Sequence, residues 1–557
     1  MTTIKNIATA GLLLSALSIP AQAADLLVNK TNPISHQEKL RGSITPERSW
    51  WDLKHYDLYV DVQPEKRYIS GTNVMTYKVL SNKDRLQIEL QPPMKLGKVT
   101  QNGKQLKVDK DGYTYFIHTV GKQEIGKEYQ VTIEFDGQPQ VAKRPPWDGG
   151  IQWEKDANGN HFIATSNQGN GASIWWPNKD HPYDEPDNGA DVSVEVPENL
   201  MDISNGRLVG IDENAARNTK TYHWRVTNTI NNYAISLNIG DYVHFSEKYQ
   251  GEKGVLDMDY YVLRDNLAKA KVQFKDATRT MEALEHWFGP YPFYEDSFKL
   301  IEVPYLGMEH QSAVTYGNGY QNGYLGRDRS RTGWGLKFDF IIVHESGHEW
   351  FANNLTNKDV ADMWIHESFT TYSENLFVEY FYGKEAGHEY MRGQRANIAN
   401  QSPIIGTYNA DRSGSSDMYD KGANMLHTIR QIVDNDKLWR EILRGLNKDF
   451  YHQIVTTEQI EKYLSEKSGK DLSSIFDQYL RDYRLPTLEY LIKDKKMMVR
   501  WSNSVKNFAM PIKVTIDGKE RWITPTTRWA SVKIDKANPS FSVDKNFYIS
   551  TLNVLGE

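Results

Sequence analysis

The chain has 557 residues, of which 25% are charged and 39% hydrophobic, with a formal net charge of −6 at pH 7 and no cysteine. This length exceeds what one hydrophobic core supports and predicts a multidomain protein. Charges of both signs are interspersed without a basic tract, which argues against nucleic acid as a partner, and the lack of cysteine excludes disulfides and a thiol nucleophile.

The first 23 residues have the pattern of a secretory signal peptide. Lys5 precedes an apolar run over residues 7–19, and Ala21-Gln22-Ala23 forms a small-residue cleavage signal. The run is too short to span a bilayer and no later stretch approaches 18 apolar residues, so we expect no stable membrane anchor. We therefore expect export, cleavage near Ala23, and a mature protein in the periplasm or extracellular space. Residues 24–45 are polar and predict a poorly ordered leader.

Residues 46–245 predict an N-terminal β domain. Apolar and polar residues alternate from Tyr56 to Val62 and again over residues 129–135, and Asp111-Gly112 predicts a hairpin. A long helix expected over residues 266–288 stops at Gly289-Pro290 and opens a second domain, expected over residues 246–485. Its strand over residues 298–303 should lie at a sheet edge and deliver the segment around Glu309, so that an extended peptide can pair with it.

Residues 344–348 read His-Glu-Ser-Gly-His, and Glu367 follows after 18 intervening residues. Residues four apart share one face of a helix, so the helix expected over residues 338–355 presents His344 and His348 to the same ion. With Glu367 as third ligand, one position stays open for water, which is typical of a catalytic zinc. We expect one Zn²⁺ per chain, with Glu345 as the general base for acyl hydrolysis.

A second helix, expected over residues 363–382, carries Glu367 and Glu374 seven residues apart on one face. Glu374 is expected to accept the second N–H of a ligand imidazole, because such imidazoles are usually bonded to a carboxylate or carbonyl. Asp362, in the polar loop before this helix, is expected to interact with the ligand side chains without binding the ion itself. Gly347 predicts a close approach of another backbone or of the substrate, because glycine weakens a helix by about 1 kcal/mol relative to alanine.

Helical patterns dominate residues 337–483, and strand-like alternation returns over residues 497–501, 512–516 and 530–534. Residues 486–557 therefore predict a small β-sandwich. The fold class expected is a multidomain α+β protein with an N-terminal β domain, a mainly helical catalytic domain and this C-terminal sandwich.

Several segments together resemble the gluzincin zinc aminopeptidases, the family of aminopeptidase N and leukotriene hydrolase. HESGHEWFAN at 344–353 resembles that family's zinc helix, and DMWIHESF at 362–369 resembles its third-ligand helix. YDKG at 419–422 resembles its Tyr-Glu-Lys-Gly segment, and Trp176-Pro177 with Asp184-Glu185-Pro186 resembles its Pro…Asp-Glu-Pro stretch. The resemblance covers nearly all of the mature chain and implies a thermolysin-like catalytic domain.

The resemblance also implies roles for residues outside the zinc motif. LGMEH at 306–310 matches the family's Gly-x-Met-Glu-Asn strand at Met308 and Glu309, with Gly307 beside them. By this likeness Glu309 binds the free amino terminus of a peptide, and a carboxylate in a closed pocket suits an ammonium. Gln168 falls at the family's second amine-side position. Tyr419 would donate its O–H to the oxyanion.

His310 replaces the family's asparagine. We expect it at the edge of the amine subsite, where an imidazole adds pH sensitivity near its ordinary pKa of about 6.5. Many relatives carry a further large helical domain after the β tail at which this chain ends, and the difference predicts a more open cleft.

The activity expected is that of a zinc aminopeptidase acting on peptides with a free N-terminus. Two alternatives stay open: a thermolysin-like zinc endopeptidase, which does not need Glu309, and a catalytically inactive peptide-binding protein on the same fold. An endopeptidase should still cleave an N-acetylated peptide, whereas an aminopeptidase should not. Turnover by the zinc-bound protein distinguishes an enzyme from an inactive binding protein.

Overall fold

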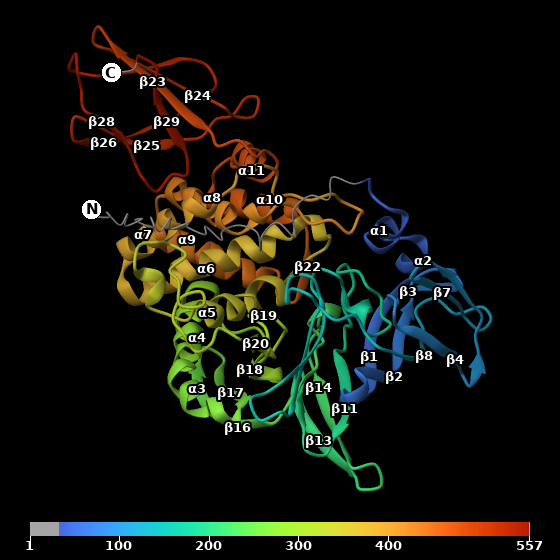
Figure 1. Ribbon diagram of the computed structural model, residues 1–557. Helices are drawn as coiled ribbons and strands as arrows, with labels where there is room; N and C mark the ends of the chain where they lie inside the picture. The colour runs from blue at the N-terminus through green and yellow to red at the C-terminus, as the bar shows by residue number, and fades with distance from the viewer. Residues whose placement is uncertain (1–32, 556–557) are drawn as a thin grey trace, which may run out of the picture.

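The computed structural model describes residues 33–555. An N-terminal β part, drawn in blue to teal, flanks a mainly helical centre, and a small β part in red stands at the opposite end (Figure 1). This arrangement confirms the predicted multidomain α+β fold class. Among residues 33–555, no helix combines the length and apolar character needed to cross a membrane.

The N-terminal part is built on an eight-stranded sheet in the order β13-β14-β11-β1-β2-β8-β4-β5. Its strands are β1 (Trp51–Gln63), β2 (Tyr68–Val79), β4 (Lys95–Gln101), β5 (Lys104–Gln105), β8 (Glu128–Gly137), β11 (Ala190–Pro197), β13 (Arg207–Asn214) and β14 (Thr219–Val226). Strand β1 pairs antiparallel with β2 and parallel with β11. Its inward residues Tyr56, Leu58, Val60 and Val62 are buried, because strand side chains alternate between the two faces.

Two smaller sheets complete this part. One has the order β12-β15-β10-β9 and the other β3-β7-β6. Their strands are β3 (Arg85–Glu89), β6 (Val108–Asp111), β7 (Thr114–His118), β9 (Gly150–Lys155), β10 (His161–Ser166), β12 (Met201–Ile203) and β15 (Asn238–Gly240). Asp111 pairs with Thr114 across the turn, which confirms the hairpin predicted at Asp111-Gly112.

The sequence predicts a poorly ordered leader over residues 24–45, but residues 33–45 form a helix and are bonded to distant residues in the structure. They contain α1 (His36–Arg41), whose N-terminus has a Ser35/Glu38 capping box, and α2 (Pro46–Ser49) follows. Polar composition concealed this order, because the contacts that hold the segment are ion pairs and hydrogen bonds to distant residues. Residues 24–32 lie outside the described residues, as does the predicted signal peptide.

The central part begins with a five-stranded sheet in the order β16-β17-β18-β20-β19. Its strands are β16 (Tyr242–Gly251), β17 (Gly254–Leu263), β18 (Phe298–Glu302), β19 (Gly307–Met308) and β20 (Val314–Tyr316). Strand β18 lies between β17 and β20, so the predicted edge position for residues 298–303 is wrong. The edge strand is β19, which pairs antiparallel with β20 and directly precedes Glu309.

Helices make up the rest of the central part. They are α3 (Leu267–Gln273), α4 (Lys275–Phe288), α5 (Phe340–Gly347), α6 (Trp364–Tyr382), α7 (Lys384–Gln394), α8 (Asp420–Val433), α9 (Asp436–Asp449), α10 (Thr457–Ser468) and α11 (Ser473–Leu480), with a small sheet of β21 (Leu355–Asn357) and β22 (Gln453–Val455). The single helix predicted over residues 266–288 divides at Phe274 into α3 and α4, and α4 stops at Gly289 as predicted.

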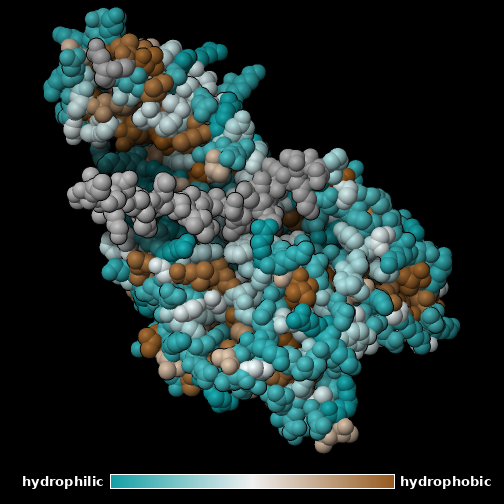
Figure 2. Space-filling view, viewed as in Figure 1, coloured by the Kyte–Doolittle hydropathy of each residue, from teal (hydrophilic) through white to brown (hydrophobic). Residues whose placement is uncertain are grey.

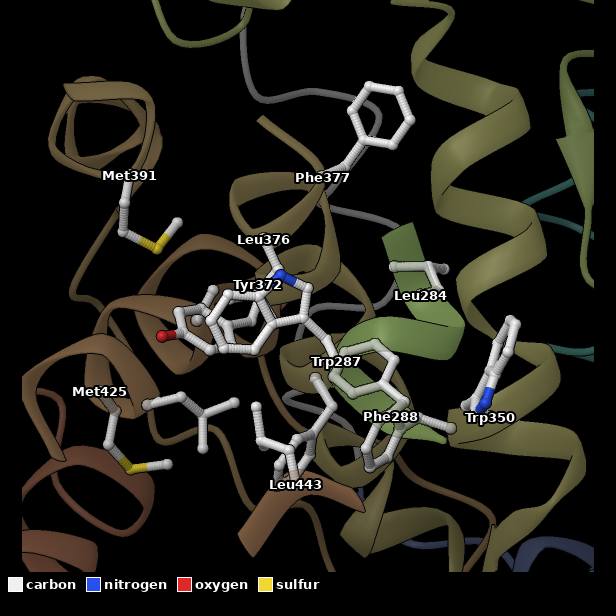
Figure 3. Packing of buried hydrophobic residues seen from close by; sticks show 14 of the residues in the cluster. Leu284, Trp287, Phe288, Trp350, Tyr372, Leu376, Phe377, Met391, Met425 and Leu443 are labelled. Carbon is white, nitrogen blue, oxygen red and sulfur yellow. The ribbon is translucent and has the colours of Figure 1, made fainter. Parts of the chain in front are cut away.

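A core of large side chains includes residues of α5 and α6. Trp287 of α4 and Tyr372 and Leu376 of α6 belong to this core, and Phe288 of α4 packs against Trp350 (Figure 3). A second core fills the N-terminal part and reaches Tyr305 and Met308, on the strand side of the site. The segment before Glu309 is therefore packed against the N-terminal core while the metal-site helices rest on the central one.

The C-terminal part has two sheets, in the orders β27-β24-β23-β29 and β26-β25-β28. Their strands are β23 (Thr487–Lys493), β24 (Lys496–Ser502), β25 (Ile512–Ile516), β26 (Lys519–Ile523), β27 (Ala530–Val532), β28 (Phe541–Val543) and β29 (Ser550–Asn553). Hydrophilic residues predominate over the face of the molecule seen in Figure 2, with hydrophobic residues gathered in small patches.

Candidate active site

The two histidines of the motif meet Glu367 in the interior of the central part. His344 and His348 come from α5 and its C-cap, and Glu367 comes from the first turn of α6. Glu367 Oε2 lies 3.7 Å from His344 Nε2 and 3.4 Å from His348 Nε2. All three ligand atoms lie within 4.8 Å of one another, and all three residues are buried.

The other ring nitrogen of each histidine is already bonded. His344 Nδ1 lies 2.8 Å from Glu374 Oε1, and His348 Nδ1 lies 3.0 Å from the carbonyl oxygen of Phe351. Glu374 Oε2 in turn accepts hydrogen bonds from Tyr390 at 2.6 Å and Gln394 at 2.8 Å. Both imidazoles are therefore oriented with Nε2 toward Glu367, as the ligands of a metal ion need to be.

The donor set fits a zinc ion. Buried carboxylate oxygens usually accept hydrogen bonds, yet Glu367 Oε2 accepts none from any residue that the structure describes. Burial opposes a charged imidazole, but the carboxylates of Glu367 and Glu374 outweigh it and raise the pKa of His344 to about 10. The field at this point favours a cation, and two imidazoles with one carboxylate are ligands that zinc accepts.

The helix carrying the histidines ends earlier than predicted. Helix α5 stops at Gly347, and a short π-helical segment, Glu349–Asn353, follows with non-helical angles at Phe351 and a positive φ of 150° at Ala352. A Cβ on Gly347 would lie 2.7 Å from Ser373 Oγ and 3.2 Å from Thr370 Cγ2. The close neighbours of this glycine are thus side chains of α6, rather than the backbone or substrate that the sequence predicts.

Glu345 lies close to His348, to Glu309 and to the edge strand β19. Gly307 makes room for it, because a Cβ there would lie 3.2 Å from Glu345 Cγ and 2.6 Å from Ile341 Cγ2. Burial, partly offset by His344, raises the pKa of Glu345 to about 7. A carboxylate with a pKa near neutrality suits both removal and return of a proton at physiological pH.

Glu309 is buried close to the same centre. Oxygen or nitrogen atoms of Glu309, Glu345 and His348 lie within 4.8 Å of one another. Glu309 Oε1 accepts hydrogen bonds from Gln168 at 2.5 Å and from Tyr233 at 2.9 Å, and its carbonyl oxygen accepts one from Asn353 at 2.9 Å. The carboxylate is therefore held from the N-terminal part, while its backbone is held by the segment that follows His348.

Tyr419 stands at the N-terminus of α8, where its ring stacks on His344 with the centroids 6.1 Å apart. Desolvation and the nearby carboxylates of Glu367 and Glu309 raise the pKa of its hydroxyl well above the usual value. The phenol therefore keeps its proton at neutral pH and remains a hydrogen-bond donor.

The structure corrects the expectation for His310. The residue is fully buried, and burial lowers the pKa of its imidazole to about 3. Both ring nitrogens lack a hydrogen-bond partner among residues 33–555. A ring that stays neutral down to this pH does not add pH sensitivity near 6.5.

Within residues 33–555, the hydrogen bonds of the Asp362 carboxylate go to residues other than the metal ligands. Its carboxylate accepts hydrogen bonds from Tyr408 at 2.5 Å and from Thr457 at 2.6 Å, so it fixes the start of α6 to α10. Sequence reasoning missed Tyr233, Asn353, Tyr390 and Gln394, which hold Glu309 and Glu374. Only the short distance of Asn353 from the zinc motif offered any signal in the sequence.

Comparison with known proteins shows which family the central part resembles. Residues 272–479 match the model of the peptidase family M1 domain. The chain is 20% identical to probable aminopeptidase 1 of Sulfurisphaera tokodaii over 523 residues, covering 89% of this chain and 62% of that protein. It is 23% identical to leukotriene A-4 hydrolase of Xenopus laevis over 447 residues, covering 75% and 68%.

Solved structures agree on the fold. An M1 zinc metallopeptidase from Deinococcus radiodurans, described as bound to a Tyr-Ser-Ala substrate, superposes with a TM-score of 0.66 at 21% identity, covering 78% of this chain and 95% of that one. Leucyl aminopeptidase of Saccharolobus solfataricus is 22% identical, and the chain spans 54% of its length. Residues 272–479 therefore carry the match to peptidase family M1, which agrees with the resemblance to the gluzincin aminopeptidases that the sequence predicts.

Proposed function

We propose that this chain is a zinc-dependent aminopeptidase that removes single residues from the amino termini of peptides. The observation that carries the proposal is the position of Glu309, whose buried carboxylate lies beside Glu345 and His348. A peptide ammonium bonded to this carboxylate places the first peptide bond, and no later one, next to the general base.

His344, His348 and Glu367 would hold one zinc ion. When bound, this ion supplies Lewis-acid chemistry, polarising the scissile carbonyl and lowering the pKa of a water molecule to about 7. Glu345 then takes the proton of the attacking water and returns it to the leaving amine, which its pKa of about 7 permits. Tyr419 donates its O–H to the oxygen that becomes negative in the tetrahedral state.

Gln168 and Tyr233 contribute by fixing Glu309. Both donate to the same oxygen, Oε1, which leaves Oε2 for the peptide ammonium. Burial raises the pKa of Glu309, with Glu367 adding to the effect and His348 opposing it, and donation to Oε1 favours the charged form that the ammonium needs.

The decisive test compares a peptide with its N-acetylated copy. We expect the free peptide to lose residues one at a time and the acetylated peptide to resist cleavage. Equal cleavage of both would favour a thermolysin-like endopeptidase. A protein that binds zinc but turns over neither peptide would favour an inactive peptide-binding protein.

We further propose that the protein is exported and acts in the periplasm or outside the cell, on the basis of the signal-peptide pattern over residues 1–23. N-terminal sequencing of the protein from fractionated cells tests this. A mature chain that begins near Ala24 in the exported fraction supports the proposal, and an intact Met1 in the cytoplasm contradicts it.

A further inference from the structure

Next to the residues that hold Glu309, a cavity of about 50 Å³ is lined by residues of the N-terminal part and of the segment that leads into α6. Gln168 and Tyr233 form one wall, and both donate to Glu309. Val360 and Met363, from the segment that leads to Glu367, also line the cavity. A peptide whose amine reaches Glu309 has its first side chain close to Gln168 and Tyr233, and so close to this cavity.

Arg41, the last residue of α1, also lines the cavity. Its Nε donates to Asp180 Oδ2 at 3.0 Å, and its Nη1 pairs with Asp411. Arg41 thus joins a loop of the N-terminal part to the loop before Tyr419. Its side chain is only 9% exposed, so both ion pairs are shielded from solvent.

The surrounding backbone is fitted to this guanidinium. A Cβ on Gly171, whose φ is +82°, would lie 2.3 Å from Arg41 Nη2 and from Asp180 Oδ2. A Cβ on Gly42 would lie 2.2 Å from the carbonyl carbon of Ala410. Glycine at both positions lets the segment approach closely enough for Arg41 to line the cavity.

Further contacts hold the segment in place from outside the cavity. Arg48 donates to the carbonyl oxygens of Arg41 at 2.6 Å and Ser43 at 2.8 Å, and pairs with Glu89 at 2.6 Å. Glu38 pairs with Arg412 at 3.0 Å. The part of the cavity lining formed by Arg41 is therefore anchored to both parts of the molecule.

We propose that residues 35–43, through Arg41, set the depth of the pocket for the first side chain of the substrate and restrict it to uncharged side chains of small or medium size. This inference rests on the proposed aminopeptidase function. The carboxylates that line the cavity are already engaged: Asp180 and Asp411 pair with Arg41, and Asp359 accepts from the backbone N–H groups of Ala361 and Asn409. A cationic first side chain would have to compete with Arg41 for Asp180 and Asp411, and with backbone N–H groups for Asp359, whereas Val360, Met363 and Ala410 offer apolar contact to an uncharged side chain.

The test measures kcat/KM for alanyl, leucyl, methionyl, lysyl and arginyl fluorogenic amides with wild type and Arg41→Ala. Wild type should cleave the uncharged amides at least about 10-fold better than the arginyl amide. In Arg41→Ala, Asp180 and Asp411 lose their cation, so the arginyl-to-alanyl ratio should rise at least about 10-fold. Lys39→Ala is the matched control, because it removes an exposed cation from the same helix, and its ratio should stay within about twofold of wild type. An unchanged ratio in Arg41→Ala, or the same rise in Lys39→Ala, overturns the proposal.

The variant Val360→Phe changes another residue that lines the cavity, and it provides the test if Arg41→Ala does not fold. Val360 is half-buried, so a larger side chain can enter the cavity. The variant should lower kcat/KM for leucyl and methionyl amides at least about 10-fold relative to the alanyl amide, and an unchanged ratio rejects this cavity as the pocket. If wild type cleaves no amide, the proposed function fails and this inference with it; if wild type cleaves them but the ratios do not move, only this inference fails.

Discussion

The metal end and the amine end of the active site are both buried carboxylate clusters, but they are built differently. At the metal end, His344, His348, Glu367 and Glu374 come from two successive helices, and Glu374 is held by α7, the next helix along the chain. At the amine end, Glu309 follows an edge strand and is held by Gln168 and Tyr233, which precede it by 141 and 76 residues. The metal end therefore depends on local helix geometry, and the amine end depends on the docking of two parts of the chain.

The largest effect on kcat is expected at Glu345, which is close to both the metal end and the amine end. Glu345→Gln keeps the shape of the side chain but removes the proton acceptor, so kcat should fall by about 100- to 10,000-fold. Zinc content, measured by elemental analysis, should equal that of wild type, because Glu345 is not a ligand. Lost zinc would mean that the residue belongs to the metal end instead.

At the amine end, Glu309→Gln removes the charge that recognises the ammonium. A charge-assisted hydrogen bond contributes about 1.5 to 3 kcal/mol, so kcat/KM for free peptides should fall by about 10- to 100-fold. Zinc affinity should be unchanged in the same preparation. A variant that cleaves free and acetylated peptides as wild type does would remove the basis for end recognition.

At the metal end, Glu374→Gln weakens the support of His344 without touching the ion. Loss of such a partner lowers metal affinity by about 10- to 100-fold, measurable by competition with a chelator. Glu389→Gln, an exposed position on α7, is the matched control and should bind zinc as wild type does. Equal affinity in the two variants would contradict the proposed link from Glu374 to the ligand.

Tyr233→Phe tests whether the N-terminal part contributes to the amine end. Gln168 remains as a donor, so KM should rise only about 2- to 10-fold with kcat little changed, and zinc affinity should be unaffected. Tyr222→Phe removes a hydroxyl bonded to a carbonyl elsewhere in the same part and should leave KM unchanged. A fall in kcat with constant KM would assign Tyr233 a different role.

The contrast between the two ends also explains what the sequence could predict. The ligand set follows from i,i+4 and two-turn spacings within helices, so His344, His348, Glu367 and Glu374 could be placed together in advance. Glu309 and Gln168 were placed by family resemblance, and Tyr233 was missed, because no local spacing relates residues brought together by domain packing. For the same reason the order of residues 33–45 was missed, since Arg41 and Glu38 find partners about 140 to 370 residues away. The strand predictions succeeded where alternation was regular, and the edge assignment of β18 failed because sheet order is not a local property.

The association of the N-terminal part with the central part should depend on pH, because Glu185 bonds across their junction. This carboxyl accepts a hydrogen bond from Thr356 of β21 at 2.7 Å, and burial raises its pKa to about 7. Because the folded protein holds this proton more tightly than the unfolded chain, the contribution to stability is complete below about pH 4.5 and declines as pH rises through about 7. Wild type should therefore lose roughly 1 to 3 kcal/mol of unfolding free energy from this group between pH 5 and pH 8. Glu185→Gln stays neutral and can still accept from Thr356, so urea unfolding at the two pH values should show a smaller loss than in wild type. An identical loss in both proteins would show that Glu185 does not carry the pH dependence of this junction, and the cohesion between the parts would then have to be sought in the ion pairs of Arg41.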